Sequence, residues 1–448
     1  MQKSSVEKQE VYVEDEPFYG LEEKPPLIET LLLGLQHMLA MFVGIITPPL
    51  IIAGVAGLNT AETGFFVSMA LMVSGVTTYV QVTKMGPVGS GLLAVHGTSF
   101  TFVPMAIAAA SEGGIPLVLG MTLAASPVEI ILSRFVKQTE KLFPPIVTGS
   151  VVMLIGFSLM EVGITDFGGG ANAENFGAPQ NLILGLFVLT IIIIANRFGK
   201  GLIKVGAVAI GLISGYIISI PLGLVDLTEV ANAGWITIPQ PFKYGLSFDI
   251  GHLLPWMLAY LITTVESIGD LTAVADVSGE DVSSDQHMER LGGGIMADGL
   301  GSALAGIFNS MPNSTFSQNI GVIQITKVGS RVVGIAVAGI LFLLGLVPKI
   351  GALVSVMPNP VLGGATIALF GMVATSGMKI VSRGGLTDRK IFIISIALSV
   401  GIGITFRPDL VEQLPEWLAT LLSSGVAVGA VIAIILNQLL PEQENKIC

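Results

Sequence analysis

Apolar runs of membrane-spanning length recur along almost the whole chain, and this feature limits the possible folds more than any other. A run of about 17–25 apolar residues can cross the hydrocarbon core of a bilayer as a helix. Of the 448 residues, 52% are hydrophobic and only 12% are charged, whereas a soluble protein carries about 25% charged residues. The sequence therefore predicts an all-α polytopic membrane protein.

We expect fourteen transmembrane segments, of which the third and the tenth are irregular. They lie at 28–54, 64–82, 90–110, 115–133, 145–163, 180–196, 203–222, 251–269, 292–308, 316–327, 332–347, 361–378, 390–406 and 419–438. The tenth segment is too short to cross the bilayer alone, so it needs the extended piece before it.

The distribution of Lys and Arg supports an even number of spans with both termini in the cytoplasm. With the N-terminus inside, all but three of the 21 Lys and Arg residues fall in cytoplasmic segments, the exceptions being Lys243, Lys349 and Arg407. This asymmetry agrees with the positive-inside rule. Residues 1–26 are polar and acidic, unlike a cleaved signal peptide, so we expect the first span to direct insertion.

The stretch from 307 to 331 is polar and broken although its neighbours are apolar. Pro312 limits helix continuity, and Asn313, Ser314 and Thr315 add hydrogen-bonding side chains. Irregular backbone at membrane depth is tolerated only where protein buries it or where it lines a watery cavity. Such half-helices mark the substrate site of transporters; the alternative is a kinked structural helix with a polar loop.

The third segment repeats this pattern. The runs 97-GTSFTFVP-104 and 312-PNSTFSQN-319 both place small hydroxyl residues and a Phe just before a new apolar run. If segments 1–7 and 8–14 are two halves, the runs occupy equivalent positions, and an odd number of spans gives the halves opposite orientations. Corresponding broken segments point to a transport site. We therefore expect a seven-plus-seven inverted repeat.

Ionisable residues inside the expected spans are costly and are functional by default. Glu266 and Asp270 lie one helical turn apart on one face, so they can bind a proton, a cation or an N–H-bearing ligand. The alternative for Asp270 is a solvated position at the cytoplasmic boundary. Asp298 follows three glycines and either bonds a broken neighbouring segment or relays protons. His37, beside Gln36 in the first span, is either a satisfied core residue or part of the site.

Several other chemistries are missing from the sequence. No phosphate-binding Gly-Lys-Ser/Thr loop suggests ATP drive, no His/Cys/Asp spacing resembles a metal site, and no Ser-His-Asp order suggests a hydrolase. The only cysteine is Cys448, which excludes a disulfide within the chain. A net charge of −11 argues against nucleic-acid binding. We expect a secondary transporter, not an enzyme, with no cofactor and no metal.

The run 318-QNIGVIQITK-327 resembles the signature of the nucleobase–ascorbate transporters, also called the nucleobase–cation symporter-2 family. The signature has Gln, Glu or Pro, then Asn, any residue, Gly, four residues of any kind, Thr, and usually Arg, Lys or Gly. The fixed positions match at Gln318, Asn319, Gly321, Thr326 and Lys327. The resemblance extends to the Gln36–His37 pair, to Glu266 in a Glu-Ser-Ile-Gly-Asp run, to Asp298 and to 358-PNPVLGGATIALFGMV-373.

This resemblance implies a fourteen-span inverted repeat with a core domain, a gate domain, and short strands in segments 3 and 10. It also implies an inner-membrane protein that forms homodimers through the gate domain. The expected parts are an acidic cytoplasmic tail at 1–26, the core domain at 27–135 and 251–347, the gate domain at 136–225 and 358–438, and a cytoplasmic tail at 439–448.

The resemblance further implies proton-coupled import of a purine nucleobase, and it is closest to the bacterial xanthine and urate permeases. Glu266 corresponds to the substrate-binding acid, Gln318 to the specificity residue and Ser99 to a pocket-lining residue of the third segment. We add Phe100 or Phe316 as a ring that can stack on the base, and Asn319 from the signature. The candidates for the coupled proton are Glu266, Asp270, Asp298 and His37.

Two alternatives stay open. Ile320 stands where many purine carriers have a second Asn, so a uracil:proton symporter of the same family is one alternative. An anion exchanger of the related inverted-repeat fold is the other, because the N-termini of facing half-helices can bind an anion. Glu266 would oppose an anion in that site.

Overall fold

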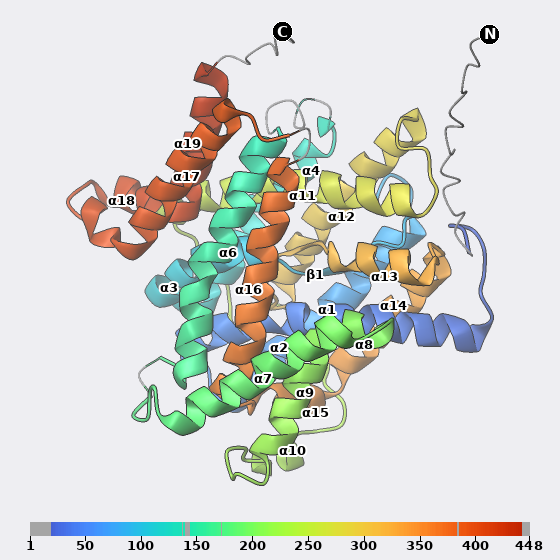
Figure 1. Ribbon diagram of the computed structural model, residues 1–448, viewed down its shortest axis with the longest axis vertical. Helices are drawn as coiled ribbons and strands as arrows, with labels where there is room; N and C mark the ends of the chain where they lie inside the picture. The colour runs from blue at the N-terminus through green and yellow to red at the C-terminus, as the bar shows by residue number, and fades with distance from the viewer. Residues whose placement is uncertain (1–18, 137, 139–143, 172, 383–384, 441–448) are drawn as a thin grey trace, which may run out of the picture.

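The computed structural model describes residues 19–440 apart from 137, 139–143, 172 and 383–384. The described chain is mostly helical, and two short strands lie in the middle of the helices (Figure 1). Most of the expected 1–26 and 439–448 tails, and Cys448, lie outside these residues.

The first half of the chain holds two long helices, a broken segment and a second group of helices. Its elements are α1 (Leu27–Val55), α2 (Thr60–Thr83), β1 (His96–Thr98), the 3₁₀ helix η1 (Phe100–Phe102), α3 (Val103–Ala125), α4 (Pro127–Leu132), α6 (Pro145–Gly168), α7 (Pro179–Phe198), α8 (Leu202–Val205) and α9 (Ala207–Ser219).

The second half repeats this order with a second broken segment. Its elements are α10 (Thr228–Asn232), α11 (Ile250–Val277), α12 (Asp285–Ile307), β2 (Asn313–Thr315), α13 (Gln318–Thr326), α14 (Arg331–Leu346), α15 (Pro348–Ser355), α16 (Asn359–Ser382), α17 (Asp388–Phe406), the 3₁₀ helix η2 (Pro408–Val411), α18 (Glu416–Ser423) and α19 (Gly425–Leu439).

Local sequence explains where several helices begin. Asn59 and Glu62 form a reciprocal capping box at the start of α2. The side chain of Asp249 accepts hydrogen bonds from the first backbone N–H groups of α11. Pro145 and Pro179 occupy the first positions of α6 and α7, where a missing N–H costs nothing.

Eight helices of the described ranges are long and apolar enough to cross a membrane, or nine if the bent pair α14–α15 is one span. This number is lower than the expected fourteen for physical reasons. The expected third and fourth segments run together from Phe100 to Leu132. α9, α13 and α19 are shorter than a bilayer requires. Gly114, with φ of 65°, marks the kink between the two joined segments.

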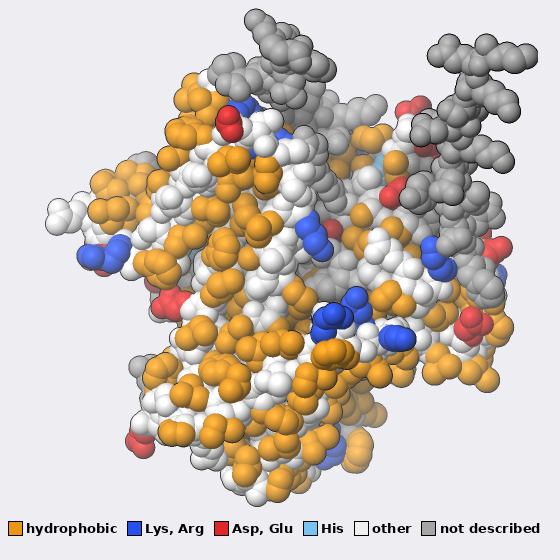
Figure 2. Space-filling view, viewed as in Figure 1, with side chains coloured by type: hydrophobic (Ala, Val, Ile, Leu, Met, Phe, Trp, Pro, Cys, Tyr) orange, Lys and Arg blue, Asp and Glu red, His pale blue; other side chains and the backbone are white. Residues whose placement is uncertain are grey.

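Apolar side chains are spread over much of the face seen in Figure 2. α7 contributes strongly to this surface, because Ile183, Leu186 and Ile193 are more than half exposed. In a soluble protein a patch of this size would be a docking or aggregation surface. In a chain with repeated spans it is the surface that contacts lipid.

Small residues bring the long helices into close contact. α6 lies along α16, and a Cβ added to Gly156 would stand 2.5 Å from the backbone nitrogen of Ala374. α2 lies along α14 in the same way, with the Cβ position of Gly75 only 2.7 Å from the nitrogen of Phe342. Such contacts replace hydrophobic burial as the source of helix association in a membrane.

The two strands pair with each other although more than 200 residues separate them in sequence. β1 and β2 are antiparallel, with the partners His96 and Thr315, Gly97 and Ser314, and Thr98 and Asn313. A Cβ at Gly97 would lie 2.6 Å from the ring of Phe316 and 2.7 Å from Ile45. Only glycine fits there, so the crossing depends on this position.

Candidate functional site

The strand crossing places two helix beginnings beside each other. The N–H of Ser99 donates to the carbonyl of Pro312 at 2.8 Å, and the N–H of Phe316 donates to the carbonyl of Val95 at 2.9 Å. These bonds extend the ladder by one residue at each end. η1 and α13 start directly after the strands, so their first N–H groups lack partners within the helix and can serve a ligand.

Glu266 lies on α11 next to the first broken segment. Its Oε2 accepts a hydrogen bond from the hydroxyl of Thr101 at 3.0 Å, which joins α11 to η1. Glu266 is half-buried, whereas the adjacent Ser267 is fully buried. The carboxyl group therefore keeps access to a ligand while one of its oxygens is held in place. Asp270, one turn further along α11, is also half-buried.

Gln318 is the first residue of α13 and is half-buried. Within the described part of the chain, its side-chain amide makes no hydrogen bond. A primary amide offers two donors and one acceptor with two lone pairs. Gln318 is thus a donor and an acceptor available at the start of a half-helix.

Asn319 and His37 fasten α13 to the rest of the core, and both are fully buried. Nδ1 of His37 lies 2.7 Å from Oδ1 of Asn319. Because an amide oxygen only accepts, Nδ1 is the donor in this bond. The amide nitrogen of Asn319 donates to the carbonyl of Leu93. The pair therefore connects α1, α13 and the segment before β1.

Asp298 on α12 contacts residues of both β1 and β2 at the strand crossing. The hydroxyl of Thr315 donates to Oδ1 at 3.1 Å, and the hydroxyl of Ser267 donates to Oδ2. Nε2 of His96 lies 2.7 Å from Oδ1. His96 and Thr315 are cross-strand partners, so one carboxyl group contacts both members of the pair.

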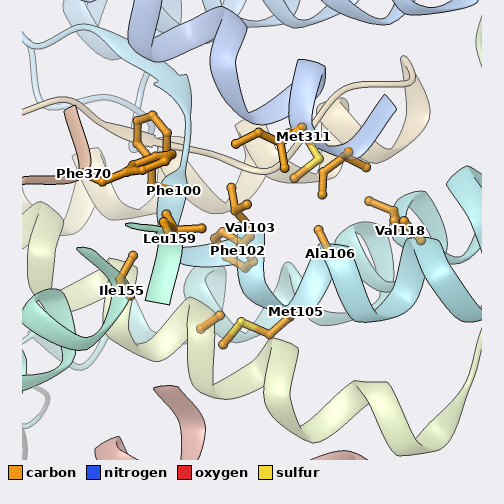
Figure 3. Close-up of a cluster of buried hydrophobic side chains, with 14 of the residues drawn as sticks. Phe100, Phe102, Val103, Met105, Ala106, Val118, Ile155, Leu159, Met311 and Phe370 are labelled. Carbon is orange, nitrogen blue, oxygen red and sulfur yellow. The ribbon is translucent and has the colours of Figure 1, made fainter. Parts of the chain in front are cut away.

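The two phenylalanines lie in different surroundings. Phe100 meets Phe370 of α16 edge to face, with ring centroids 5.8 Å apart, and Figure 3 shows Leu159 and Ile155 close to them. The Phe316 ring lies 3.0 Å from the Cβ position of Gly44 and 2.6 Å from that of Gly97, and it belongs to an apolar cluster with Met41 and Ile45 of α1. Phe100 therefore lies where α16 meets the broken segment, and Phe316 does not.

A cavity of about 660 Å³ opens between the ends of α1, α3, α6, α11 and α16. Polar groups line part of it, including Asp166 and His252. Met105 and Leu159 line it as well, and both belong to the apolar cluster around Phe100 and Phe370. The cavity thus borders the apolar cluster that contains Phe100 and Phe370.

Sequence reasoning missed several residues that the structure brings to this region. Thr101, His96 and Ser267 contact Glu266 or Asp298, and Glu129 of α4 is fully buried close by. The hydroxyl residues carried no signal, because Ser and Thr are common in spans. Glu129 did carry one, as the only acid of the expected 115–133 segment.

Comparison with known proteins identifies the group to which this arrangement belongs. Residues 28–410 match the Xan_ur_permease profile, which describes a permease family. The chain is 44% identical over 443 residues to the xanthine permease XanP of Escherichia coli, covering 96% of both chains. It is 39% identical over 442 residues to the xanthine permease XanQ of the same species, covering 95% of both.

A third relative is the nucleobase transporter PlUacP of Paenibacillus larvae, 39% identical over 420 residues, with 93% of this chain and 96% of the relative covered. Two solved structures share the fold at low identity. The transmembrane domain of the cyanobacterial bicarbonate transporter BicA gives a TM-score of 0.59 at 16% identity, covering 93% of this chain and 99% of that one. The murine Solute Carrier 26 family member A9 anion transporter gives 0.61 at 13%, covering 93% and 69%.

These matches extend over nearly all of the described chain and include its broken segments. The chain therefore belongs to the nucleobase–cation symporter-2 family of permeases, and it is a multi-pass membrane transporter rather than an enzyme.

Proposed function

We propose that the chain imports a purine nucleobase, xanthine or urate, across the cytoplasmic membrane by proton symport. The observation that carries this proposal is the half-buried carboxyl group of Glu266, held by Thr101, on a helix that packs against α13, where the amide of Gln318 is available. The relatives XanP and XanQ are xanthine permeases by name, which supports a purine dione as the substrate.

The chemistry of a purine dione fits these groups. Its edge alternates N–H donors and C=O acceptors in one plane. Glu266 can accept from an N–H, and the Gln318 amide can donate and accept side by side. The hydroxyl of Ser99 and the first N–H groups of η1 and α13 add further polar contacts. The Phe100 ring supplies an apolar face for stacking, while Asn319 and Phe316 support the site from inside the core.

We also propose the fourteen-span inverted repeat, with the core domain at 27–135 and 251–347 and the gate domain at 136–225 and 358–438. Its support is that helix contacts come in matching pairs. α2 packs on α14 as α12 packs on α3 and α4, and α7 packs on α9 as α17 packs on α19. Dimerisation through the gate domain and cytoplasmic termini belong to the same proposal.

The coupled ion in this proposal is a proton. Among the titratable candidates, Glu266 bonds η1 and Asp298 bonds β2. His37 bonds Asn319 of α13, and Asp270 lies one turn from Glu266 on α11. A gradient drives transport only if protonation shifts the balance between outward-open and inward-open states. Carboxyl groups that bond both broken segments meet that requirement, because their charge acts on the site itself.

Competition for uptake tests the substrate. Labelled xanthine is supplied to cells that lack their own nucleobase carriers and express this chain, with urate, uracil, guanine or ascorbate as competitor. We expect xanthine uptake and strong competition by urate or guanine. Uptake blocked by uracil alone would favour the uracil carrier instead.

The shared fold favours one candidate from another class, an anion exchanger. BicA is a bicarbonate transporter, and the murine protein is an anion transporter. The Glu266 carboxyl group would have to be neutral or displaced for an anion to bind beside it. Chloride-dependent bicarbonate exchange in vesicles containing the purified chain, without xanthine uptake, would support that candidate.

A further inference from the structure

Glu129 is a third carboxylic acid buried beside the candidate site, and substrate recognition does not use it. It lies in the first turn of α4, which begins at Pro127 after the long run of α3. Its side chain is 0% exposed. A fully buried acid inside an expected span is a functional residue by default, because a structural role rarely justifies its desolvation.

α4 is pressed against α12 at the position next to Asp298. A Cβ added to Gly299 would lie 2.9 Å from the nitrogen of Ile130 and 3.2 Å from the Cβ of Glu129. The missing side chain at 299 therefore lets Glu129 approach the helix turn that carries Asp298. The labels of α4, α11 and α12 lie together in Figure 1, and all three helices contact one another.

One face of α11 carries Glu266 and contacts the other two acids. The hydroxyl of Thr263 donates to Oε1 of Glu129 at 3.1 Å. Glu266 follows three residues later, and Ser267, which donates to Asp298, comes after it. Positions i, i+3 and i+4 share one face of a helix. A change of charge at Glu129 therefore changes the electrostatic potential within one helical turn of Glu266, the proposed substrate acid.

The hydrogen bonding of the three acids differs. Asp298 has partners from Thr315, Ser267 and His96. Oε2 of Glu129 has no partner within the described ranges, although it is fully buried. Both oxygens of Asp298 thus accept hydrogen bonds, whereas Oε2 of Glu129 accepts none among the described residues and can take up a proton.

The titratable groups that face Glu129 are Asp298 from α12, and Glu266 and the Tyr260 phenol from α11. His96 lies behind Asp298. The Tyr260 hydroxyl donates to the carbonyl of Thr122, so it offers Glu129 no charge. The two facing carboxyl groups therefore add negative charge around Glu129 rather than compensate it.

We propose that Glu129 is a proton-binding residue of the transport cycle, an inference that rests on the proposed symport. A proton from external water forms an O–H bond on the carboxylate and leaves a neutral acid; release to cytoplasmic water breaks that bond and restores the carboxylate. Neutral Glu129 removes one of the like charges around this turn, so Glu266 can stay ionised and accept the N–H of the base. Proton and base thereby favour each other's binding.

The test uses purified full-length protein, measured both for binding and in liposomes. In Glu129→Gln, a mimic of the neutral acid, we expect xanthine affinity to become independent of pH between about 5 and 7, where xanthine stays neutral and the wild type changes about tenfold. Exchange of labelled for unlabelled xanthine continues, while accumulation driven by a pH gradient is lost. Glu289→Gln, an exposed acid of α12, is the matched control and keeps the wild-type profile.

The outcomes separate this inference from the proposed function. Wild-type accumulation that ignores the pH gradient contradicts the symport itself. Proton-driven wild type with an unchanged Glu129→Gln variant overturns only the role of Glu129. If Glu129→Gln does not fold, Thr263→Val decides: it keeps the acid and removes its hydrogen bond, so the midpoint of the pH profile must move, and an unmoved midpoint rejects the role.

Discussion

Glu266 and Ser267 are neighbours on α11, but their side chains differ in burial and in hydrogen-bond partners. Ser267 is buried and donates to Asp298, whereas Glu266 is half-buried and bonds only Thr101 among the described residues. Ser267 therefore helps to hold the strand crossing, whereas Glu266, one position earlier, is accessible to a substrate. This geometry gives Glu266→Gln a specific consequence.

Glu266→Gln keeps the shape of the side chain and removes the charged acceptor. We expect xanthine binding to weaken by about 1.5–3 kcal/mol, the range for hydrogen bonds to charged groups. Calorimetric titration of the purified protein measures the change, with Glu289→Gln as the control. An affinity equal to that of the wild type would remove Glu266 from the site.

Gln318→Glu tests specificity on the other side of the crossing. The change replaces the amide donor with an acceptor, so we expect purine diones to compete less well and uracil to compete better. The inhibition profile across bases is the readout. Gln324→Glu is the matched control, because Gln324 is exposed on the same helix. Identical profiles for wild type and Gln318→Glu would show that Gln318 does not read the base.

Single site residues could be predicted where a polar side chain interrupts an apolar run or belongs to the signature. Glu266, Asp298 and Gln318 stand out as polar groups in apolar or signature runs, and the structure gathers their helices around the strands. Thr101 and His96 could not be identified, because their importance depends on contacts between distant segments. Glu129 showed the same lone-acid pattern as Glu266 and was missed for lack of a motif around it.

At the scale of elements, the two broken segments depend on each other. β1 and β2 have three residues each, too few to be stable alone. The cross-strand bonds and the Asp298 contacts hold them, and Gly97 allows the close approach of Phe316. A side chain at Gly97 therefore affects both segments.

Gly97→Ala should destabilise the protein by about 1–3 kcal/mol, the cost of overpacking a tight core. The lowered melting temperature of the detergent-purified protein is the measurement. Gly339→Ala serves as control, since nothing lies within 4 Å of the Cβ position at 339. Equal melting temperatures for the two variants would mean that the strand crossing tolerates a wider separation.

The breaks in these segments could be predicted from Pro312 and from the small polar residues, whereas the details could not. The expected 90–110 segment contains β1, η1 and the start of α3, and α3 continues through Gly114 into the expected fourth segment. Helix periodicity cannot reveal that a chain turns at a glycine and continues as a helix. Strand pairing across half the chain has no local signal at all.

At the scale of the whole molecule, the three basic side chains expected on the non-cytoplasmic side, Lys243, Lys349 and Arg407, each contact a neighbouring group. Lys349 donates to the carbonyl of Val230 at 2.8 Å, and Lys243 lies 3.6 Å from the ring centre of Phe65. Arg407 pairs with Asp409, and its hydrogen bonds hold the pKa of that carboxyl group below its usual value. Local contacts therefore hold these three charges, which the expected topology places on the side that the positive-inside rule disfavours.

The central claim is that a proton gradient drives a purine base through this site, and accumulation of labelled xanthine in liposomes tests it most directly. With the interior at pH 7.5, we predict that accumulation rises as the external pH falls toward about 5–6, because protonation from outside favours the loaded state. It should ignore sodium and collapse with a protonophore. Accumulation that follows a sodium gradient at fixed pH and survives the protonophore would contradict the account.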